Sequence, residues 1–199
     1  MERFRLDPES LLSVYAQGAF PMADRDGVIR LYTADPRGVL PLDAFHVPHT
    51  LRQLVKKPAD RGGFEIRFNH DFEATMRGCM ARRPEGTWIN GELIKAYLRL
   101  HDLGYAHSVE AWRDGQLAGG LYGVSLGAAF FGESMFHRER DASKVALVHL
   151  VERLRERKFE LLDTQATTSH LRTFGAVDIP AREYLVRLRK ALATEREFG

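Results

Sequence analysis

The spacing of apolar residues alternates between the periods of strands and helices, most clearly in the last two thirds of the chain. Apolar and polar residues alternate over 64–68, as in a half-buried strand, and the sequence over 69–104 has the caps and spacing of two helices. Residues 107–136 are rich in glycine, aromatic and β-branched side chains around the hairpin signal Asp114-Gly115, and predict three antiparallel strands. A long helix, the strand FELLDTQ and two helical pieces follow. This order, βαα-βββ-αβ-α, predicts an α+β fold with a mainly antiparallel central sheet.

The first forty residues have a simpler pattern. A short helix is expected to begin at Asp7-Pro8, because Asp is a good N-cap and Pro suits the first helical position, and to end at Gly18. A strand over 28–33 and a turn over 34–38 follow. The predicted domains are a small N-terminal one over residues 1–35 and a main one over residues 36–199.

The amino-acid composition excludes several classes of protein. With 44% hydrophobic and 28% charged among 199 residues, the chain has too much apolar sequence for a disordered protein and too many interspersed charges for a membrane bundle. Its one cysteine, Cys79, cannot form an internal disulfide, and zinc ligands would have to come mainly from eight scattered histidines. The N-terminus does not resemble a signal peptide. These features predict a cytoplasmic protein without a metal or a membrane partner.

The charge is nearly balanced, with 29 Lys and Arg against 27 Asp and Glu. Basic residues nevertheless gather over 52–67, at Arg82 and Arg83, and over 153–158. They form either one basic face that binds nucleic acid or ordinary solvated helix faces, and composition alone does not separate the two.

The motifs of several enzyme classes are absent. The sequence has no P-loop, dinucleotide-binding fingerprint, HExxH motif, nucleophile elbow or cysteine pair, which argues against kinases, hydride transfer and metalloproteases.

The candidate catalytic residues are polar residues that lie within apolar strands. Glu133 lies among large apolar neighbours, where an unpartnered carboxylate is costly. Asp163 and Gln165, two residues apart on a strand, share one face and are expected to point into one cleft, although strand-end residues bonded to loop backbone would give the same pattern. Trp88, in a loop, is either a core residue or the wall of a ligand pocket.

A series of short motifs follows in a fixed order along the chain. The motifs are Gly18-Ala-Phe-Pro21, Asp35-Pro-Arg37, Glu85-Gly-Thr-Trp-Ile89, the run from Tyr97 to Ser108, Gly119-Gly-Leu-Tyr-Gly123, Gly132-Glu-Ser-Met-Phe136, Ala142-Ser-Lys-Val-Ala-Leu147 and Leu162-Asp-Thr-Gln165. Together they resemble the bacterial leucyl/phenylalanyl-tRNA-protein transferases, in a form with a short N-terminus. The similarity extends over residues 11–188. It implies a small N-terminal domain before a GNAT-like acyltransferase domain. The implied reaction moves Leu, Phe or Met from aminoacyl-tRNA to proteins that begin with Arg or Lys, which marks them for degradation.

The resemblance also implies roles for individual residues. It places Asp163, Gln165 and Glu133 at the catalytic centre, Trp88, Leu121 and Phe130 around the transferred side chain, and Arg52, Lys56 and Lys57 at the tRNA acceptor stem. This chemistry fits the residue types, because an aminoacyl ester is already activated and its reaction with an amine needs no metal, cofactor or covalent intermediate. The implied partners are aminoacyl-tRNA and the acceptor proteins, with no DNA.

Two other functions remain open. A CoA-dependent N-acyltransferase of the same fold would need a backbone nest for the pyrophosphate, and its usual Gly-containing loop is not found before the helix at Asp141. A non-catalytic tRNA-binding module would keep the basic face without needing Asp163 or Gln165. Retention on a CoA matrix separates the first from the aminoacyltransferase, and transfer activity separates the second. The remaining candidates, His107, His137, His170 and Cys79, are interpreted as structural residues.

Overall fold

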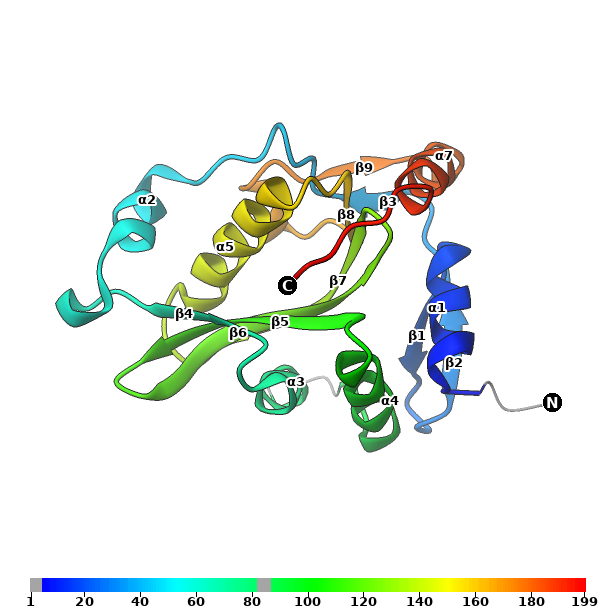
Figure 1. Cartoon of the computed structure of the whole chain (residues 1–199), viewed down its shortest axis with the longest axis horizontal. Coiled ribbons are helices and arrows are strands. Elements are labelled where there is room, and N and C mark those ends of the chain that lie inside the picture. The colour runs from blue at the N-terminus through cyan, green and yellow to red at the C-terminus, as the bar shows by residue number, and fades with distance from the viewer. Residues whose placement is uncertain (1–4, 82–86) are drawn as a thin grey trace.

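Seven strands form one sheet in the order β4-β5-β6-β7-β8-β3-β9, and helices cover both of its faces (Figure 1). The computed structural model describes residues 5–81 and 87–199. All neighbouring strands are antiparallel except β7 and β8, which run parallel. The strands of this sheet are β3 Arg37–Val39, β4 Glu65–Phe68, β5 Ala106–Arg113, β6 Gln116–Leu126, β7 Ala129–His137, β8 Leu161–Gln165 and β9 Val177–Ile179. The predicted α+β fold with a mainly antiparallel sheet is confirmed.

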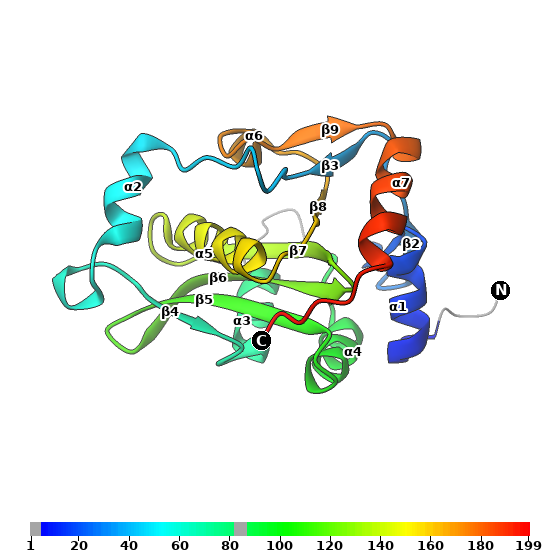
Figure 2. The same cartoon turned by 45° about the horizontal axis from the view of Figure 1, so that its top comes forward.

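The helices form a layer on each face of the sheet (Figures 1 and 2). The α-helices are α1 Pro8–Ala16, α2 His49–Lys56, α3 Phe72–Met80, α4 Gly91–Asp102, α5 Ala142–Glu156, α6 Ser169–Arg172 and α7 Ala181–Leu192, with a short 3-10 turn, η1, at Ala59–Arg61. Successive side chains of β6 pack against the helices on opposite faces of the sheet, because side chains alternate along a strand. Leu121 packs in the cluster that includes α5, and Tyr122 packs in the cluster that includes α3 and α4. The sheet is therefore buried on both sides.

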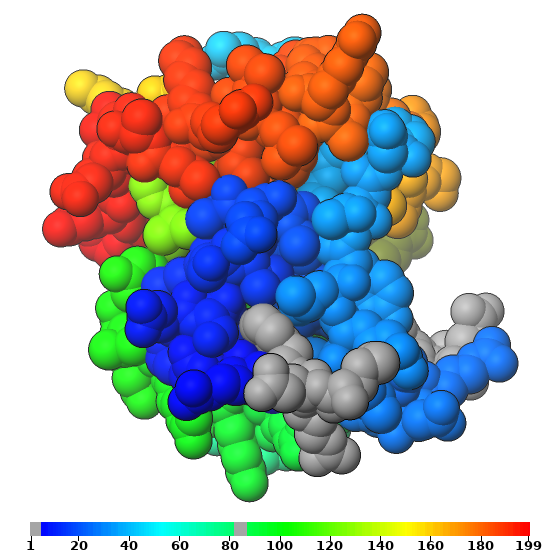
Figure 3. All heavy atoms as spheres, turned by 90° about the vertical axis from the view of Figure 1, so that its right-hand side faces the viewer, coloured from blue at the N-terminus to red at the C-terminus, as the bar shows by residue number. Residues whose placement is uncertain are grey.

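The N-terminal segment forms α1 and a two-stranded antiparallel sheet of β1 Phe20–Ala23 and β2 Ile29–Tyr32. Leu11 and Tyr15 of α1 are fully buried in the same apolar cluster as Tyr97 of α4. Figure 3 shows this blue segment lying directly against α7, drawn in orange and red. Residues from both ends of the chain thus meet beside the main sheet.

Local capping and turn signals are confirmed where the sequence is most explicit. The Asn90 side chain accepts a hydrogen bond of 2.9 Å from the Leu93 N–H and begins α4, and Asp7 caps α1 through the Ser10 N–H in the same way. Asp114 and Gly115 both have positive φ, at 49° and 73°, as the predicted hairpin between β5 and β6 requires. No helix among the described residues is long and apolar enough to cross a membrane.

The predicted turn over 34–38 is wrong in its second half. Arg37 and Gly38 belong to β3, which lies inside the main sheet between β8 and β9. Gly38 permits this position, because a Cβ atom there would lie only 2.6 Å from the backbone carbon of Ala166. The strands β1 and β9 were also not predicted. The sequences of β1 (Phe-Pro-Met-Ala) and β3 (Arg-Gly-Val) do not alternate between apolar and polar residues, and β9 alternates over only three residues.

Candidate active site

An apolar cavity of about 410 Å³ opens where β7 and β8 separate. The two strands are paired only as far as Phe131 and Asp163, and the residues beyond these diverge around the cavity. Its apolar lining comes from the N-terminal segment, the loop before α4, the sheet, α5 and α6, and includes Phe20, Met22, Trp88, Leu121, Leu147, Leu150, Leu162 and Leu171. The polar residues in its wall include Glu133, Ser134, Thr164 and Gln165. An apolar pocket with a few polar groups is the usual form of a small-molecule site.

The Glu133 side chain on β7 is buried beside this cavity and has one oxygen fully engaged. Its Oε1 accepts hydrogen bonds from the Tyr15 hydroxyl at 2.8 Å and from the Gln165 side-chain amide at 3.0 Å. Tyr15 in turn hydrogen-bonds the Tyr97 hydroxyl. Glu133 Oε2 has no hydrogen-bond partner among the described residues. Burial raises the pKa of this carboxyl to about 8, so both its protonated and its ionised forms are populated near neutral pH.

Gln165, the last residue of β8, has a left-handed backbone conformation with φ 63°. Two bonds accompany this conformation: its backbone N–H donates to Asp163 Oδ1 at 2.8 Å, and its side-chain amide donates to Glu133. A left-handed non-glycine residue costs free energy and persists only where its surroundings fix it. Thr164 and Gln165 both line the cavity, because the regular alternation of the strand ends here.

Asp163 is fully buried and does not line the cavity. Its carboxylate forms a two-point ion pair with Arg37, Nε to Oδ1 at 2.9 Å and Nη2 to Oδ2 at 2.6 Å, and also accepts a 2.7 Å bond from the Tyr184 hydroxyl. Arg37 donates as well to the Gly18 carbonyl at 2.9 Å. The prediction that Asp163 and Gln165 point into one cleft is therefore wrong. The turn in the backbone at Gln165 sends its side chain into the cavity, whereas the Asp163 side chain points toward Arg37.

Comparison with known proteins identifies the chain's relatives. The sequence profile described as "Leucyl/phenylalanyl-tRNA protein transferase" matches residues 39–189, and the profile of that family's N-terminal domain matches residues 4–35. The chain belongs to the leucyl/phenylalanyl-tRNA protein transferase family. It is therefore an aminoacyltransferase.

Two curated members of the family are similar over nearly their whole length. The leucyl/phenylalanyl-tRNA--protein transferase of Rubrobacter xylanophilus is 54% identical over 196 residues, which cover 98% of this chain and all of that protein. The protein of the same name from Maricaulis maris is 53% identical, over 96% of this chain and 88% of its own length. A solved ribosomal-protein-alanine N-acetyltransferase from Brucella melitensis aligns with a TM-score of 0.38 and 18% identity, over 56% of this chain and 86% of that one.

The three residues predicted to surround the transferred side chain do not all lie at the transferase's cavity. Trp88 and Leu121 line it. Phe130 does not: it is fully buried and its ring packs at 5.4 Å from that of Phe198. Phe130 is paired with Leu162, before β7 and β8 diverge, and the C-terminal residues cover it. The prediction for Phe130 is thus corrected to a core role.

The residues predicted to bind tRNA lie on the opposite side of α5 from the sheet. Arg52 and Lys56 on α2, and Lys57 just after it, are all exposed. The helix α2 packs against α5, which supplies Leu147 and Leu150 to the cavity. Of the other basic residues, Arg82 and Arg83 lie outside the described residues. The basic stretch over 153–158 is partly structural, because Arg155 donates to the Leu42 and Phe45 carbonyls and Arg153 stacks on Phe68.

Three residues of the polar cluster, Arg37, Tyr184 and Tyr15, were not predicted as site residues. Arg37 lies in one of the motifs that the family resemblance rests on, and this was the available signal. Tyr15 fits the apolar stripe of α1, and Tyr184 lies in a helix of ordinary pattern. Among the other candidates, Cys79 is a buried core residue, and buried His107 bonds Asn69 and Ser125, as their structural interpretation predicts.

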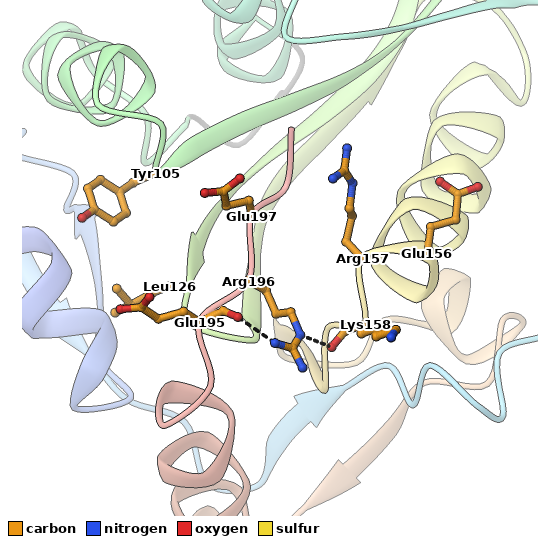
Figure 4. Close-up of a pocket in the computed structure, with 9 residues that line it drawn as sticks. Tyr105, Leu126, Glu156, Arg157, Lys158, Glu195, Arg196 and Glu197 are labelled. Carbon is orange, nitrogen blue, oxygen red and sulfur yellow. Dashed lines mark hydrogen bonds between the residues drawn. The ribbon is translucent and has the colours of Figure 1, made fainter.

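A larger cavity, of about 720 Å³, lies near the C-terminus and has a different character (Figure 4). Its lining includes Tyr105, Leu126, three glutamates, two arginines and a lysine, and Arg196 donates across it to the Lys158 carbonyl. None of the predicted site residues lines it. In the part of the chain that the structure describes, no three His, Cys, Asp or Glu side chains are grouped as metal ligands.

Proposed function

We propose that this chain moves Leu, Phe or Met from aminoacyl-tRNA to the α-amino group of a protein that begins with Arg or Lys, and that this marks the acceptor for degradation in the cytoplasm. The observation that carries the proposal is the apolar cavity that ends at Glu133 and Gln165. Family membership supports aminoacyl transfer, and the cavity supports a large apolar side chain on the donor.

The donor side chain enters the cavity between Trp88 and Leu121. Burial of a large apolar side chain gives about 1.5–3 kcal/mol, and Leu, Phe and Met all fall within this range, so the cavity discriminates only weakly among the three. The aminoacyl ester then lies at the polar end of the cavity, beside Gln165 and Glu133.

The reaction joins the acceptor nitrogen to the ester carbonyl carbon and breaks the bond to the ribose oxygen. The side-chain amide N–H of Gln165 donates to Glu133, so the side-chain carbonyl oxygen of Gln165 is left to accept a hydrogen bond from the attacking amine. This hydrogen bond orients the lone pair of the amine toward the ester carbonyl carbon. The Glu133 carboxylate takes the proton that the amine loses and then gives a proton to the leaving ribose oxygen, so no net proton is gained or lost. The pKa of Glu133, about 8, is close to that of an α-amino group, which suits this exchange.

Asp163 acts as a positioning residue in this proposal. Its carboxylate holds the Gln165 backbone N–H, and Arg37 with Tyr184 holds the carboxylate. These bonds fix the backbone of Gln165 and therefore the position of its side chain, which faces the substrates. The basic residues Arg52, Lys56 and Lys57 contact the phosphates of the tRNA acceptor stem.

The test is a transfer assay with a mixture of charged tRNAs and peptides that differ only in their first residue. We expect labelled Leu, Phe or Met on peptides that begin with Arg or Lys, and a loss of about 10²-fold or more in Gln165→Ala with donor binding nearly unchanged. Transfer of small or charged amino acids, or full activity in Gln165→Ala, would overturn the proposal. The exposed Gln17→Ala is the matched control, because its amide bonds only within α1.

A further inference from the structure

A third cavity, of about 480 Å³, has a basic lining and adjoins the apolar cavity at Glu133 and Gln165, which we call the donor cavity. It lies where β7 ends and α5 begins, and we call it the basic cavity. Met135 and His170 line both cavities, so the two are neighbours. The remaining lining residues of the basic cavity are His137, Arg138, Arg140, Asp141, Ser143 and Lys144.

The charges around the basic cavity favour an anion. Three permanent cations, Arg138, Arg140 and Lys144, line it together with one carboxylate, Asp141, and of the three Arg138 also donates to the Leu117 carbonyl at 3.0 Å. The Lys144 ammonium donates to Asp141 Oδ1 at 2.6 Å, which leaves it two further protons to donate. The Arg140 side chain is 96% exposed and makes only a 3.5 Å contact with Asp141, so its guanidinium is available to a ligand.

Two further donors converge on the same cavity. Ser143 is only 5% exposed, lines the cavity, and has a hydroxyl without a hydrogen-bond partner among residues 5–81 and 87–199. The helix α5 begins here without a side-chain cap, since Asp141 bonds Lys144 instead, and its first turn holds no acidic residue. Uncapped backbone N–H groups at a helix N-terminus favour an anion.

We propose that the basic cavity binds the 5′-phosphate of the terminal nucleotide of the aminoacyl-tRNA. This inference rests on the proposed function. In the donor, one ribose carries both the aminoacyl ester and the 5′-phosphate, so only this ribose separates the phosphate from the ester. Since the ester lies at the polar end of the donor cavity, the phosphate must lie close to that cavity. A basic cavity that shares a wall with an apolar one matches this arrangement. Contact with the phosphate then fixes the ester against Gln165.

Two minimal donors test the proposal: 3′-O-phenylalanyl-adenosine and the same ester with a 5′-monophosphate. With a peptide that begins with Arg as acceptor, we expect the phosphate to lower KM about tenfold in the unmodified protein, as one charge-assisted hydrogen bond would, with kcat little changed. Lys144→Ala should abolish this difference, and Lys144→Arg should keep most of it. Lys190→Ala, which removes an exposed lysine of α7, is the control and should keep all of it.

The possible outcomes separate this inference from the proposed function. If the unmodified protein uses both donors with the same KM, the phosphate site is refuted while aminoacyl transfer stands. If it uses neither donor, the proposed function fails and this inference with it. A full tenfold difference in Lys144→Ala places the phosphate elsewhere and overturns the inference. Arg140→Ala, in a nearly fully exposed side chain, is the second variant if Lys144→Ala does not fold, and it should also reduce the difference.

Discussion

Replacement of Arg37 by Leu should both destabilise the protein and disable transfer. Arg37 and Asp163 are 1% and 0% exposed, so water cannot take the place of either partner. The change removes two hydrogen bonds of the ion pair and the bond to the Gly18 carbonyl, and it leaves the Asp163 carboxylate buried with Tyr184 and the Gln165 N–H as its partners. Breaking a buried pair on one side costs about 3–5 kcal/mol of unfolding free energy.

The cost is measured by urea unfolding at pH 7, with transfer activity measured in parallel. For a chain of this length, 3–5 kcal/mol corresponds to a fall in Tm of about 6–20 °C. The double variant Arg37→Leu/Asp163→Leu removes the unpaired charge as well, and we expect it to regain much of the stability. It should not regain activity, because the Gln165 N–H loses the carboxylate that holds it.

This pair of variants separates a structural role from a positioning role. If the double variant regained both stability and transfer, the ion pair would serve the fold alone. A cost below about 1 kcal/mol for Arg37→Leu would refute the argument from burial, because that value is typical of exposed ion pairs. Arg37→Lys keeps the charge but loses the two-point geometry, and should retain part of the stability with reduced transfer.

Three further results are expected. Glu133→Gln should change the pH dependence of stability. In the unmodified protein the folded state keeps the Glu133 proton up to about pH 8, whereas the unfolded state releases it near pH 4.5, so the stability that Glu133 contributes falls as the pH rises from 4.5 to 8. The urea midpoint of the variant should not show this fall over the same pH range. Leu121→Trp should fill the cavity and shift transfer toward smaller donors, and an unchanged preference among Leu, Phe and Met would exclude Leu121 from the donor pocket. Lys56→Ala with Lys57→Ala should weaken binding of all tRNAs about equally and reduce the slope of log K against log salt by up to about 2, whereas an unchanged slope would place the tRNA elsewhere.

The sequence by itself determined the local structure and the unusual character of Glu133. Side-chain alternation, the Asn90 cap and the Asp114-Gly115 hairpin depend on neighbours within a few residues, so the pattern predicted them correctly. A carboxylate among large apolar residues also indicated a costly burial, and its pKa is indeed raised to about 8. The ordered motifs indicated the family.

Only the tertiary structure decided which residues hold one another. Arg37 and Asp163 are 126 residues apart, and Tyr15 and Glu133 are 118 apart, so their pairing depends on where distant elements meet. Periodicity gives the face of a strand but not the residue at which the strand ends. The left-handed backbone at Gln165 reverses the simple alternation there, which is why Asp163 lies behind the site and Gln165 within it.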